Sequence, residues 1–439
     1  MVLSGAHLID PRADIEGTFD LVVRDGEIAE LCTPGAVAPT SDTELVDARG
    51  LTVLPGFVDP HVHLRTPGRE DEEDLESGTR AAAAGGFCAV LAMPNTDPVT
   101  DNAAVLCSLQ ERASEQANVP VGFFCSITRE MAGTDLSEMA ELALEGAAGF
   151  TDDGVPVREA RVMRRALQYQ RLSGAVLALH EEDPSLSGKG VMHEGAVSTQ
   201  LGLAGIPSVS ESTMIDRDAE LARYEDGRIH VLHLSAAESV EAVAHAKQRG
   251  TRVTAEVTPH HLTLTDDRVR SLDSNLKMNP PLRSESDRQA LIDGLRSGVI
   301  DCVATDHAPH SREEKEMPFE QAPMGVTGLE TAFAALYTDL VAPGVISLEL
   351  LLERMTSAGK LFGLAAPTLA QGAPANLCLI DLESSWTVGE SGYESRSSNS
   401  CFAGRSLQGK VLMTLASGSV AFRERSFSIR LASATEGGR

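Results

Sequence analysis

LTVLPGFVDPHVHLR, residues 51–65, begins as an apolar run with β-propensity and ends in His61, His63 and Arg65. In a strand, residues two positions apart point to the same face, so the two imidazoles converge at the strand's end. Two converging neutral imidazoles make half of a zinc site. Arg65 places beside them a cation that can hold a carboxylate through two hydrogen bonds. The same residues could instead be two surface histidines at a strand end. Later parts of the chain decide between this interpretation and a metal site.

This stretch opens a series of eight apolar, strand-like runs, and most of them are separated by Ala-, Glu- and Arg-rich segments with helical spacing. The alternation predicts an α/β fold, a (β/α)8 barrel, whose usual size of about 250 residues fits the region. An open doubly wound sheet is the alternative, and it is disfavoured because no glycine-rich phosphate loop follows the first strand. The long segment 181–227 predicts extra loops. The runs are 51–59, 87–93, 119–127, 146–151, 174–180, 228–234, 251–257 and 299–305.

The two ends of the chain have a different sequence pattern, which predicts short strands and turns instead of alternating strands and helices. FDLVVRDGEIAEL (19–31) alternates apolar and polar residues around Asp25-Gly26, a strong hairpin signal. GKVLMTLASGSVAF (409–422) is similar, with a turn near Ser417-Gly418. Neither end has enough strands for a sheet domain of its own. We therefore expect one composite β domain, residues 1–52 and 366–439, with a barrel domain, residues 53–365, inserted between its halves.

Charge and composition exclude several classes of partner. The 37 Lys and Arg residues stand against 64 Asp and Glu residues, a net charge of −27 that repels nucleic acid and anionic membranes. Aromatic residues make up only 4%, too few for a base-stacking surface. No apolar run approaches about 18 residues, so we expect no membrane span. The seven cysteines lack CxxC spacing and predict free thiols in a reducing cytoplasm.

Polar side chains follow the apolar runs where a barrel carries its chemistry, at the C-terminal ends of strands. One histidine at such a place is most simply structural, but four histidines at the ends of three strands are poorly explained by coincidence. They therefore predict a metal site. The residues at these ends are His61, His63, Arg65, Asn95, Asp152, Asp153, His180, His233 and Asp306.

The number of ligands predicts two metal ions. Four imidazoles and two carboxylates exceed one tetrahedral zinc, whereas two ions about 3.5–4 Å apart that share a carboxylate use all six. Water held between such ions is a nucleophile at neutral pH. Asp306 would take its proton and pass it to a leaving nitrogen. We expect His61, His63 and Asp306 on one ion, His180 and His233 on the other, and Asp153 between them.

Three further features lie near this predicted centre. His310, in HAPHS, could face a substrate. Asn279, in LKMNPPLR, is either a turn residue or a substrate contact, and the residues leave that open. Residues 311–325 are charged, punctuated by proline and without apolar periodicity. We expect this segment to close over bound substrate.

The chain resembles the dihydroorotase branch of the amidohydrolase superfamily, and more narrowly its longer bacterial, class I type. The motifs are PGFVDPHVHLR, MPNT, GFTDDG, KMNPPLR, ATDHAPHSREEKE and MGVTGLET, and the likeness continues into the C-terminal SNSCFAGRSLQGKV. It implies a distorted (β/α)8 barrel with a small β-sandwich built from both termini. It also implies two Zn²⁺ ions per subunit and the reversible cyclisation of N-carbamoyl-L-aspartate to L-dihydroorotate in pyrimidine biosynthesis.

The resemblance also implies roles for single residues, and the implied metal ligands are the same six. Thr66 stands where an aspartate is common and Met324 where an aromatic residue is common, which bears on substrate fit more than on the chemistry. The implied substrate contacts are Arg65, Asn95 and His310 on the carboxylate, Asn279 and the Met324-Gly325 backbone along the ring, and His63 beside the metal.

Two alternatives are weighed against this interpretation. Related hydantoinases and dihydropyrimidinases usually bridge their metals with a carbamylated lysine at the end of strand four, where this chain has GFTDDG. That difference and Arg65 disfavour a hydantoinase or an allantoinase. A non-catalytic dihydroorotase-like partner of aspartate transcarbamoylase would be expected to lose ligands, and none is lost here. We expect a cytoplasmic homodimer, open to association with an aspartate transcarbamoylase.

Overall fold

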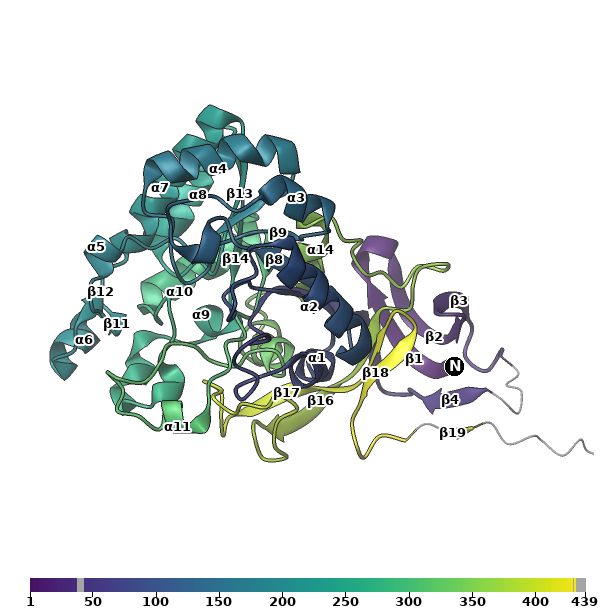
Figure 1. Cartoon of the computed structure of the whole chain (residues 1–439). Coiled ribbons are helices and arrows are strands. Elements are labelled where there is room, and N and C mark those ends of the chain that lie inside the picture. The colour runs from purple at the N-terminus through teal and green to yellow at the C-terminus, as the bar shows by residue number, and fades with distance from the viewer. Residues whose placement is uncertain (38–42, 429, 432–439) are drawn as a thin grey trace, which may run out of the picture.

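The computed structural model describes residues 1–37, 43–428 and 430–431. An eight-stranded parallel sheet forms the larger part of the molecule, and its strands follow one another in sequence order, β6 to β15 (Figure 1). Val62 pairs with His307, and the His63 amide donates to the His307 carbonyl at 2.8 Å, so the first strand meets the segment after the last one. The predicted barrel is confirmed. Its strands are β6 (Phe57–Val62), β7 (Phe87–Ala92), β8 (Val121–Cys125), β9 (Gly149–Phe150), β10 (Leu177–Leu179), β13 (Arg228–Val231), β14 (Arg252–Val257) and β15 (Cys302–Val303).

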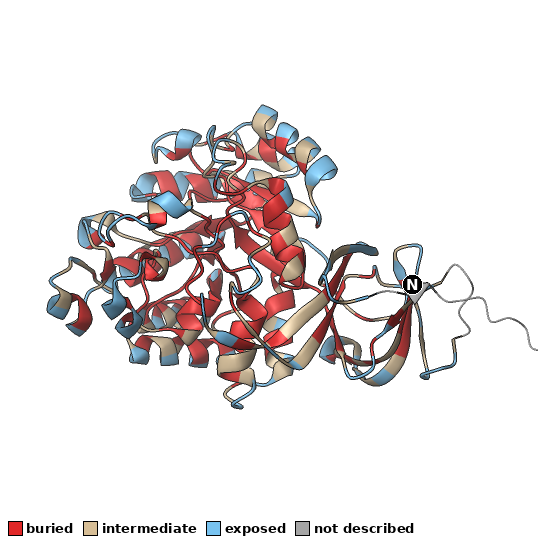
Figure 2. Cartoon of the chain, turned by 90° about the horizontal axis from the view of Figure 1, so that it is seen from below, coloured by how far each residue is buried: buried red, intermediate tan, exposed pale blue. Residues whose placement is uncertain are grey.

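The helices that surround the barrel form where the sequence has apolar residues at helical spacing. In α4, the buried residues Val162, Met163, Ala166 and Leu167 form one stripe that faces inward. Figure 2 shows the same arrangement in the whole barrel, with buried strands and exposed outer helix faces. The helices between the barrel strands are α1 (Leu75–Ala84), α2 (Ala103–Gln116), α3 (Met139–Leu144), α4 (Ala160–Ser173), α7 (Val209–Glu225), α8 (Ala237–Gln248) and α10 (Glu285–Ser297), and α13 (Leu348–Thr356) follows the last strand.

Short elements occupy the connections, and the long segment 181–227 carries the extra structure expected there. Among the described residues, no helix combines the length and apolar character needed to cross a membrane. These short elements are η1 (Pro11–Ala13), η2 (Arg129–Met131), α5 (Pro184–Ser187), β11 (Met192–His193), α6 (Ala196–Leu201), β12 (Gly205–Ile206), α9 (Pro259–Thr263), η3 (Asp266–Ser271), η4 (Ser274–Leu276), α11 (Arg312–Lys315), α12 (Ala332–Leu336), the π-helical turn η5 (Tyr337–Val341) and α14 (Ala358–Leu361).

The two ends of the chain form one nine-stranded sheet beside the barrel, in the order β18-β17-β16-β5-β1-β2-β3 with β4 and β19 alongside (Figure 1). Its core draws Leu8 and Leu21 from the N-terminal part and Leu379 and Leu415 from the C-terminal part. The strands are β1 (Val2–Asp10), β2 (Ile15–Arg24), β3 (Glu27–Cys32), β4 (Glu44–Asp47), β5 (Thr52–Pro55), β16 (Leu377–Thr387), β17 (Ser406–Ala416), β18 (Ser419–Arg423) and β19 (Arg430–Leu431).

Both predicted hairpin turns are confirmed, at Asp25-Gly26 and at Ser417-Gly418. All four residues have positive φ, 52° and 82° in the first turn and 49° and 80° in the second. Two consecutive left-handed residues match the right-handed twist of the flanking strands, which is why two-residue hairpins prefer this geometry.

One strand prediction is wrong, because the run 51–59 is two strands in two different sheets. β5 pairs with β1 and β16 in the terminal sheet, whereas β6 is the first strand of the barrel. The chain crosses from one sheet to the other at Gly56, where an added Cβ would lie 2.8 Å from the Cys88 sulfur. The division at residues 52/53 and 365/366 stays a prediction, and the pairing of β5 leads us to propose Gly56 as the first boundary.

Candidate metal centre

The structure brings all six predicted ligands together, buried at the C-terminal ends of the barrel strands. They form two groups, and within each group the candidate ligand atoms lie within 4.8 Å of one another. This grouping is the one expected from the strand order, with the central aspartate included in the second group. The groups are His61, His63 and Asp306, and Asp153, His180 and His233.

Asp153 lies between the two groups. Its Oδ2 is 3.5 Å from His61 Nε2 and 3.4 Å from His63 Nε2. Its Oδ1 is 3.5 Å from His233 Nε2 and 3.6 Å from His180 Nδ1. Each oxygen therefore faces one group, which is the arrangement that a bridging carboxylate requires.

The backbone at this rim is held in an uncommon conformation. Arg65, His233 and Asp306 have φ of 55°, 32° and 49°, in the left-handed region that side chains other than glycine rarely adopt. Such positions cost on the order of 1–3 kcal/mol each and persist only where the surrounding structure enforces them. The barrel thus directs these side chains at the expense of local stability.

The first two histidines are oriented from behind by acceptors. His61 donates through Nδ1 to Glu256 Oε1 at 2.7 Å, and His63 donates through Nδ1 to Asn95 Oδ1 at 2.9 Å. Both imidazoles then present Nε2 to the centre as the deprotonated nitrogen that a metal needs. Glu256 is fully buried in β14 and also contacts His230 Nε2 at 3.0 Å.

The residues of the centre fit a divalent cation. Among the described residues, His61 Nε2 and Asp153 Oδ1 are buried without a hydrogen-bond partner. Burial opposes protonation of His61, yet Asp153, Asp306 and Glu256 outweigh it and raise its pKa well above the ordinary value. The carboxylates of the centre therefore favour a positive charge at this position. A set of imidazole nitrogens and carboxylate oxygens is one that Zn²⁺ accepts.

Arg65 and His310, two predicted carboxylate contacts, also come together. Arg65 Nη2 lies 3.4 Å from His310 Nε2, and Arg65 Nε donates to the Pro309 carbonyl at 3.0 Å. The third predicted contact, Asn95, binds His63. Asn95 thus lies on the side of the centre formed by the first histidine pair. The contact of Arg65, Asn95 and His310 with a substrate stays a prediction.

The predicted ring contacts lie on two sides of the centre. Asn279 donates through Nδ2 to Glu182 Oε2 at 2.7 Å, and Glu182 lies 3.2 Å from His180 Nε2. The Met324 carbonyl accepts from His310 Nε2 at 2.9 Å. At Gly325, where φ is 138°, an added Cβ would lie 2.8 Å from His310 Nε2, so a larger residue would displace that ring.

The segment 311–325, predicted to close over substrate, is anchored at its base. The Lys315 amine donates to the carbonyls of Pro323 at 3.1 Å and Gly325 at 2.9 Å. The Lys277 amine donates to the carbonyl of Ala322 at 2.7 Å. Closure over substrate stays a prediction, and any movement starts from this anchored base.

Three carboxylates near the centre were not identified from the sequence: Glu72, Glu182 and Glu256. Glu72 lies in the acidic run REDEED (69–74), which looks like a solvated surface. Glu256 lies in the run 251–257, where an alternating polar residue is expected to face solvent. The only available signal was the position of Glu256 near the end of a barrel strand.

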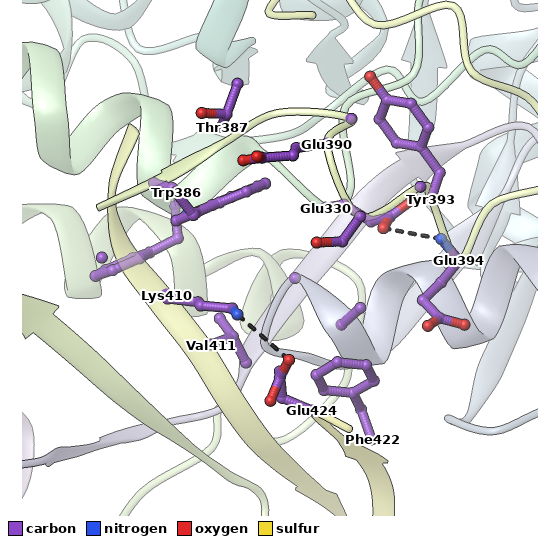
Figure 3. Close-up of a pocket in the computed structure, with 18 of the residues that line it drawn as sticks. Glu330, Trp386, Thr387, Glu390, Tyr393, Glu394, Lys410, Val411, Phe422 and Glu424 are labelled. Carbon is purple, nitrogen blue, oxygen red and sulfur yellow. Dashed lines mark hydrogen bonds and ion pairs between the residues drawn. The ribbon is translucent and has the colours of Figure 1, made fainter. Parts of the chain in front are cut away.

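A cavity of about 400 Å³ lies apart from this centre, where the barrel meets the terminal sheet (Figure 3). Phe333, Trp386, Tyr393 and Phe422 line it together with the Lys410–Glu424 ion pair. None of the six predicted metal ligands lines this cavity.

The parallel barrel and its rim of histidines and aspartates define a class, the metal-dependent hydrolases of amidohydrolase type. A family model described as "Dihydro-orotase-like" matches residues 50–239. Dihydroorotases from Anaeromyxobacter dehalogenans and Pelotomaculum thermopropionicum are each 45% identical to the chain, covering 97% of it and 98% and 99% of those proteins. The L-hydantoinase from Arthrobacter aurescens superposes with a TM-score of 0.84 at 26% identity, covering 95% of both chains. The chain belongs to the dihydroorotase family.

Proposed function

We propose that this chain interconverts L-dihydroorotate and N-carbamoyl-L-aspartate, the hydrolysis of a cyclic amide and its reverse, in pyrimidine biosynthesis. The observation that carries the proposal is the Arg65–His310 pair beside the two ligand groups that Asp153 joins. A ring substrate that bears a carboxylate needs such cationic and hydrogen-bonding groups next to the hydrolytic centre, and a neutral ring does not.

The six ligands would hold two Zn²⁺ ions per subunit, in the two groups described above. When bound, such ions polarise the amide carbonyl and make water more acidic. Asp306, whose Oδ1 lies 3.1 Å from His63 Nε2, would accept the proton of the attacking water. The water oxygen bonds to the carbonyl carbon, the ring C–N bond breaks, and Asp306 returns the proton to the leaving nitrogen. Cyclisation reverses these transfers.

The proposal extends to the form of the enzyme. All seven cysteines are free, which suits a reducing cytoplasm. A homodimer and an association with an aspartate transcarbamoylase follow from the resemblance, and sedimentation of the protein with and without that partner tests both.

A panel of cyclic amides tests the proposed activity. We expect kcat/KM for L-dihydroorotate to exceed that for hydantoin, allantoin and dihydrouracil by about 100-fold. Two hydrogen bonds to the carboxylate, about 1.5 kcal/mol each, supply this difference. Removal of metal with a chelator should abolish turnover and Zn²⁺ should restore it. Equal or faster turnover of a neutral ring would contradict the proposal and favour the hydantoinase alternative.

A further inference from the structure

Glu72 is buried in a part of the chain that reads as surface. Its side chain is 1% exposed, whereas that of Asp71 beside it is 70% exposed. A carboxylate removed from water is costly unless charges and hydrogen bonds compensate for the lost solvation. Its partners therefore indicate why it is there.

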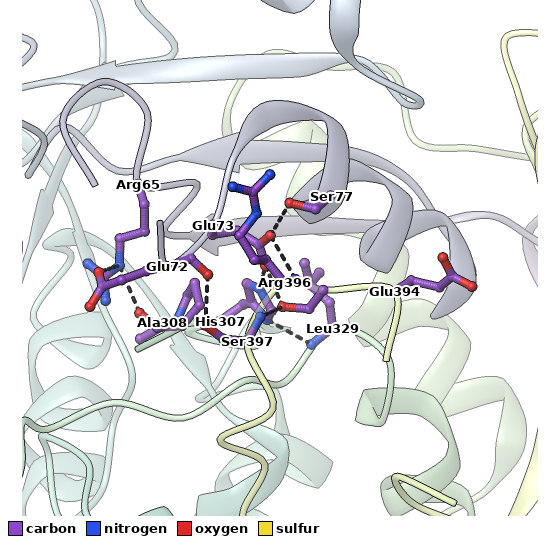
Figure 4. Close-up of polar contacts among 12 residues, drawn as sticks. Arg65, Glu72, Glu73, Ser77, His307, Ala308, Leu329, Glu394, Arg396 and Ser397 are labelled. Carbon is purple, nitrogen blue, oxygen red and sulfur yellow. Dashed lines mark hydrogen bonds and ion pairs between the residues drawn. The ribbon is translucent and has the colours of Figure 1, made fainter. Parts of the chain in front are cut away.

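Two guanidinium donors and one imidazole nitrogen converge on the two oxygens of Glu72. Oε2 lies 3.2 Å from Arg65 Nε. Oε1 lies 2.8 Å from Arg69 Nη2 and 3.1 Å from His310 Nδ1. Figure 4 shows the Glu72 carboxylate against the Arg65 side chain. Arg69 in turn reaches Glu314 at 2.8 Å, so the same network extends to the segment 311–325.

These contacts select which edge of Arg65 remains for a ligand. A guanidinium can hold a carboxylate through Nε and Nη2 or through Nη1 and Nη2. Glu72 and the Pro309 carbonyl take the Nε side. The end formed by Nη1 and Nη2 is left, and Nη2 lies next to the His310 ring.

We propose that Glu72 is a positioning residue, which sets Arg65 and His310 so that a substrate carboxylate binds end-on to Nη1 and Nη2. This inference rests on the proposed function, because it concerns the carboxylate of a dihydroorotate-like ring. Glu72 touches neither the substrate nor the metal ligands in this account and acts through its two partners.

A purely electrostatic role predicts the opposite effect of removing the charge. If Glu72 only weakened the positive field of the pocket, Glu72→Gln would make an anion bind more tightly. If Glu72 positions its partners, the glutamine amide turns its NH₂ toward a guanidinium donor, Arg65 Nε or Arg69 Nη2, and that donor moves away. The direction of the change therefore separates the two roles.

The experiment measures kcat and KM for L-dihydroorotate and the Kd of orotate, a planar ring with the same carboxylate, in Glu72→Gln and Glu72→Asp. We expect KM and the orotate Kd to rise about 10-fold in Glu72→Gln, with kcat within about 3-fold of wild type, because one charge-assisted hydrogen bond is lost. Glu72→Asp keeps the charge but shortens the reach, and a smaller loss of affinity is expected. The matched control is Glu76→Gln, a 69% exposed glutamate, which should behave as wild type.

A double-mutant cycle with Arg65→Lys identifies the route of the effect. In the Arg65→Lys background, Glu72→Gln should change the orotate Kd less than about 2-fold, because the fork that Glu72 orients is already gone. Tighter or unchanged orotate binding in Glu72→Gln, or a full effect in the Arg65→Lys background, overturns the inference. If Glu72→Gln does not fold, an unchanged orotate Kd in Glu72→Asp overturns the inference instead. If the wild-type protein does not turn over L-dihydroorotate, that result contradicts the proposed function rather than the positioning role of Glu72.

Discussion

Substitution of Glu256 by glutamine should weaken metal binding at one ligand group more than at the other. The fully buried Glu256 carboxylate accepts from His61 Nδ1 at 2.7 Å, and its other oxygen lies 3.0 Å from His230 Nε2, outside the ligand group of His61. The substitution preserves shape and leaves an oxygen to accept from His61. It removes the negative charge that strengthens that bond and makes the imidazole a better ligand.

The size of the effect follows from the type of hydrogen bond. A bond to a charged acceptor contributes about 1.5–3 kcal/mol and a neutral one about 0.5–1.5 kcal/mol, so the loss is about 1–1.5 kcal/mol. That corresponds to about a 5- to 13-fold weaker affinity for the ion held by His61. In the group around His180, the His233 backbone amide donates to Glu256 Oε1 at 3.3 Å. A glutamine oxygen can still accept this neutral bond, so the affinity of that group for its ion should change less than about 3-fold.

Equilibration in zinc buffers, followed by elemental analysis of zinc per chain, measures this difference. Glu225→Gln is the control, because Glu225 is also buried and ion-paired, with Arg164 at 2.6 Å, but lies outside the centre. We expect the control to bind zinc as wild type does, while Glu256→Gln loses one ion at a higher free zinc concentration than the other. Parallel loss of both ions, or wild-type binding, would refute the reasoning.

Three further changes test the proposed roles. Asp306→Asn should lower kcat about 10²-fold or more in protein fully loaded with metal, and near-normal turnover would assign the proton transfer to another residue. Arg65→Lys should lower kcat/KM for L-dihydroorotate about 10-fold, or about 1.4 kcal/mol, because the planar fork is lost; a kinetically silent variant would contradict the carboxylate assignment. Lys315→Met removes the amine that holds the Pro323 and Gly325 carbonyls, so limited proteolysis within 311–325 should become faster, and unchanged cutting would argue against anchoring.

The barrel and its six candidate ligands were predictable because local patterns carry the information. Eight apolar runs each supply a strand, and parallel strands joined in sequence order bring their C-terminal ends to one rim. A residue that directly follows a run therefore has a predictable location. His61 and Asp306 come together for this reason although they stand at opposite ends of the barrel sequence.

The transition between the two sheets was not predictable in the same way. The run 51–59 is mostly apolar along its length, yet β5 and β6 belong to different sheets. Hydrophobic pattern shows that a segment is buried, but partner strands decide the sheet to which it belongs. Those partners include β16, which lies more than three hundred residues later in the chain.

The sequence by itself determined the alternating elements, the hairpin turns and the candidate ligands at the strand ends, because each depends on near neighbours. Tertiary structure alone decided which charged residues support them. Glu72 and Glu256 resemble surface glutamates in their local sequence, and both are buried because cationic or imidazole partners from distant segments compensate for the lost water. That compensation depends on atoms brought together only by folding, so no local pattern contains it.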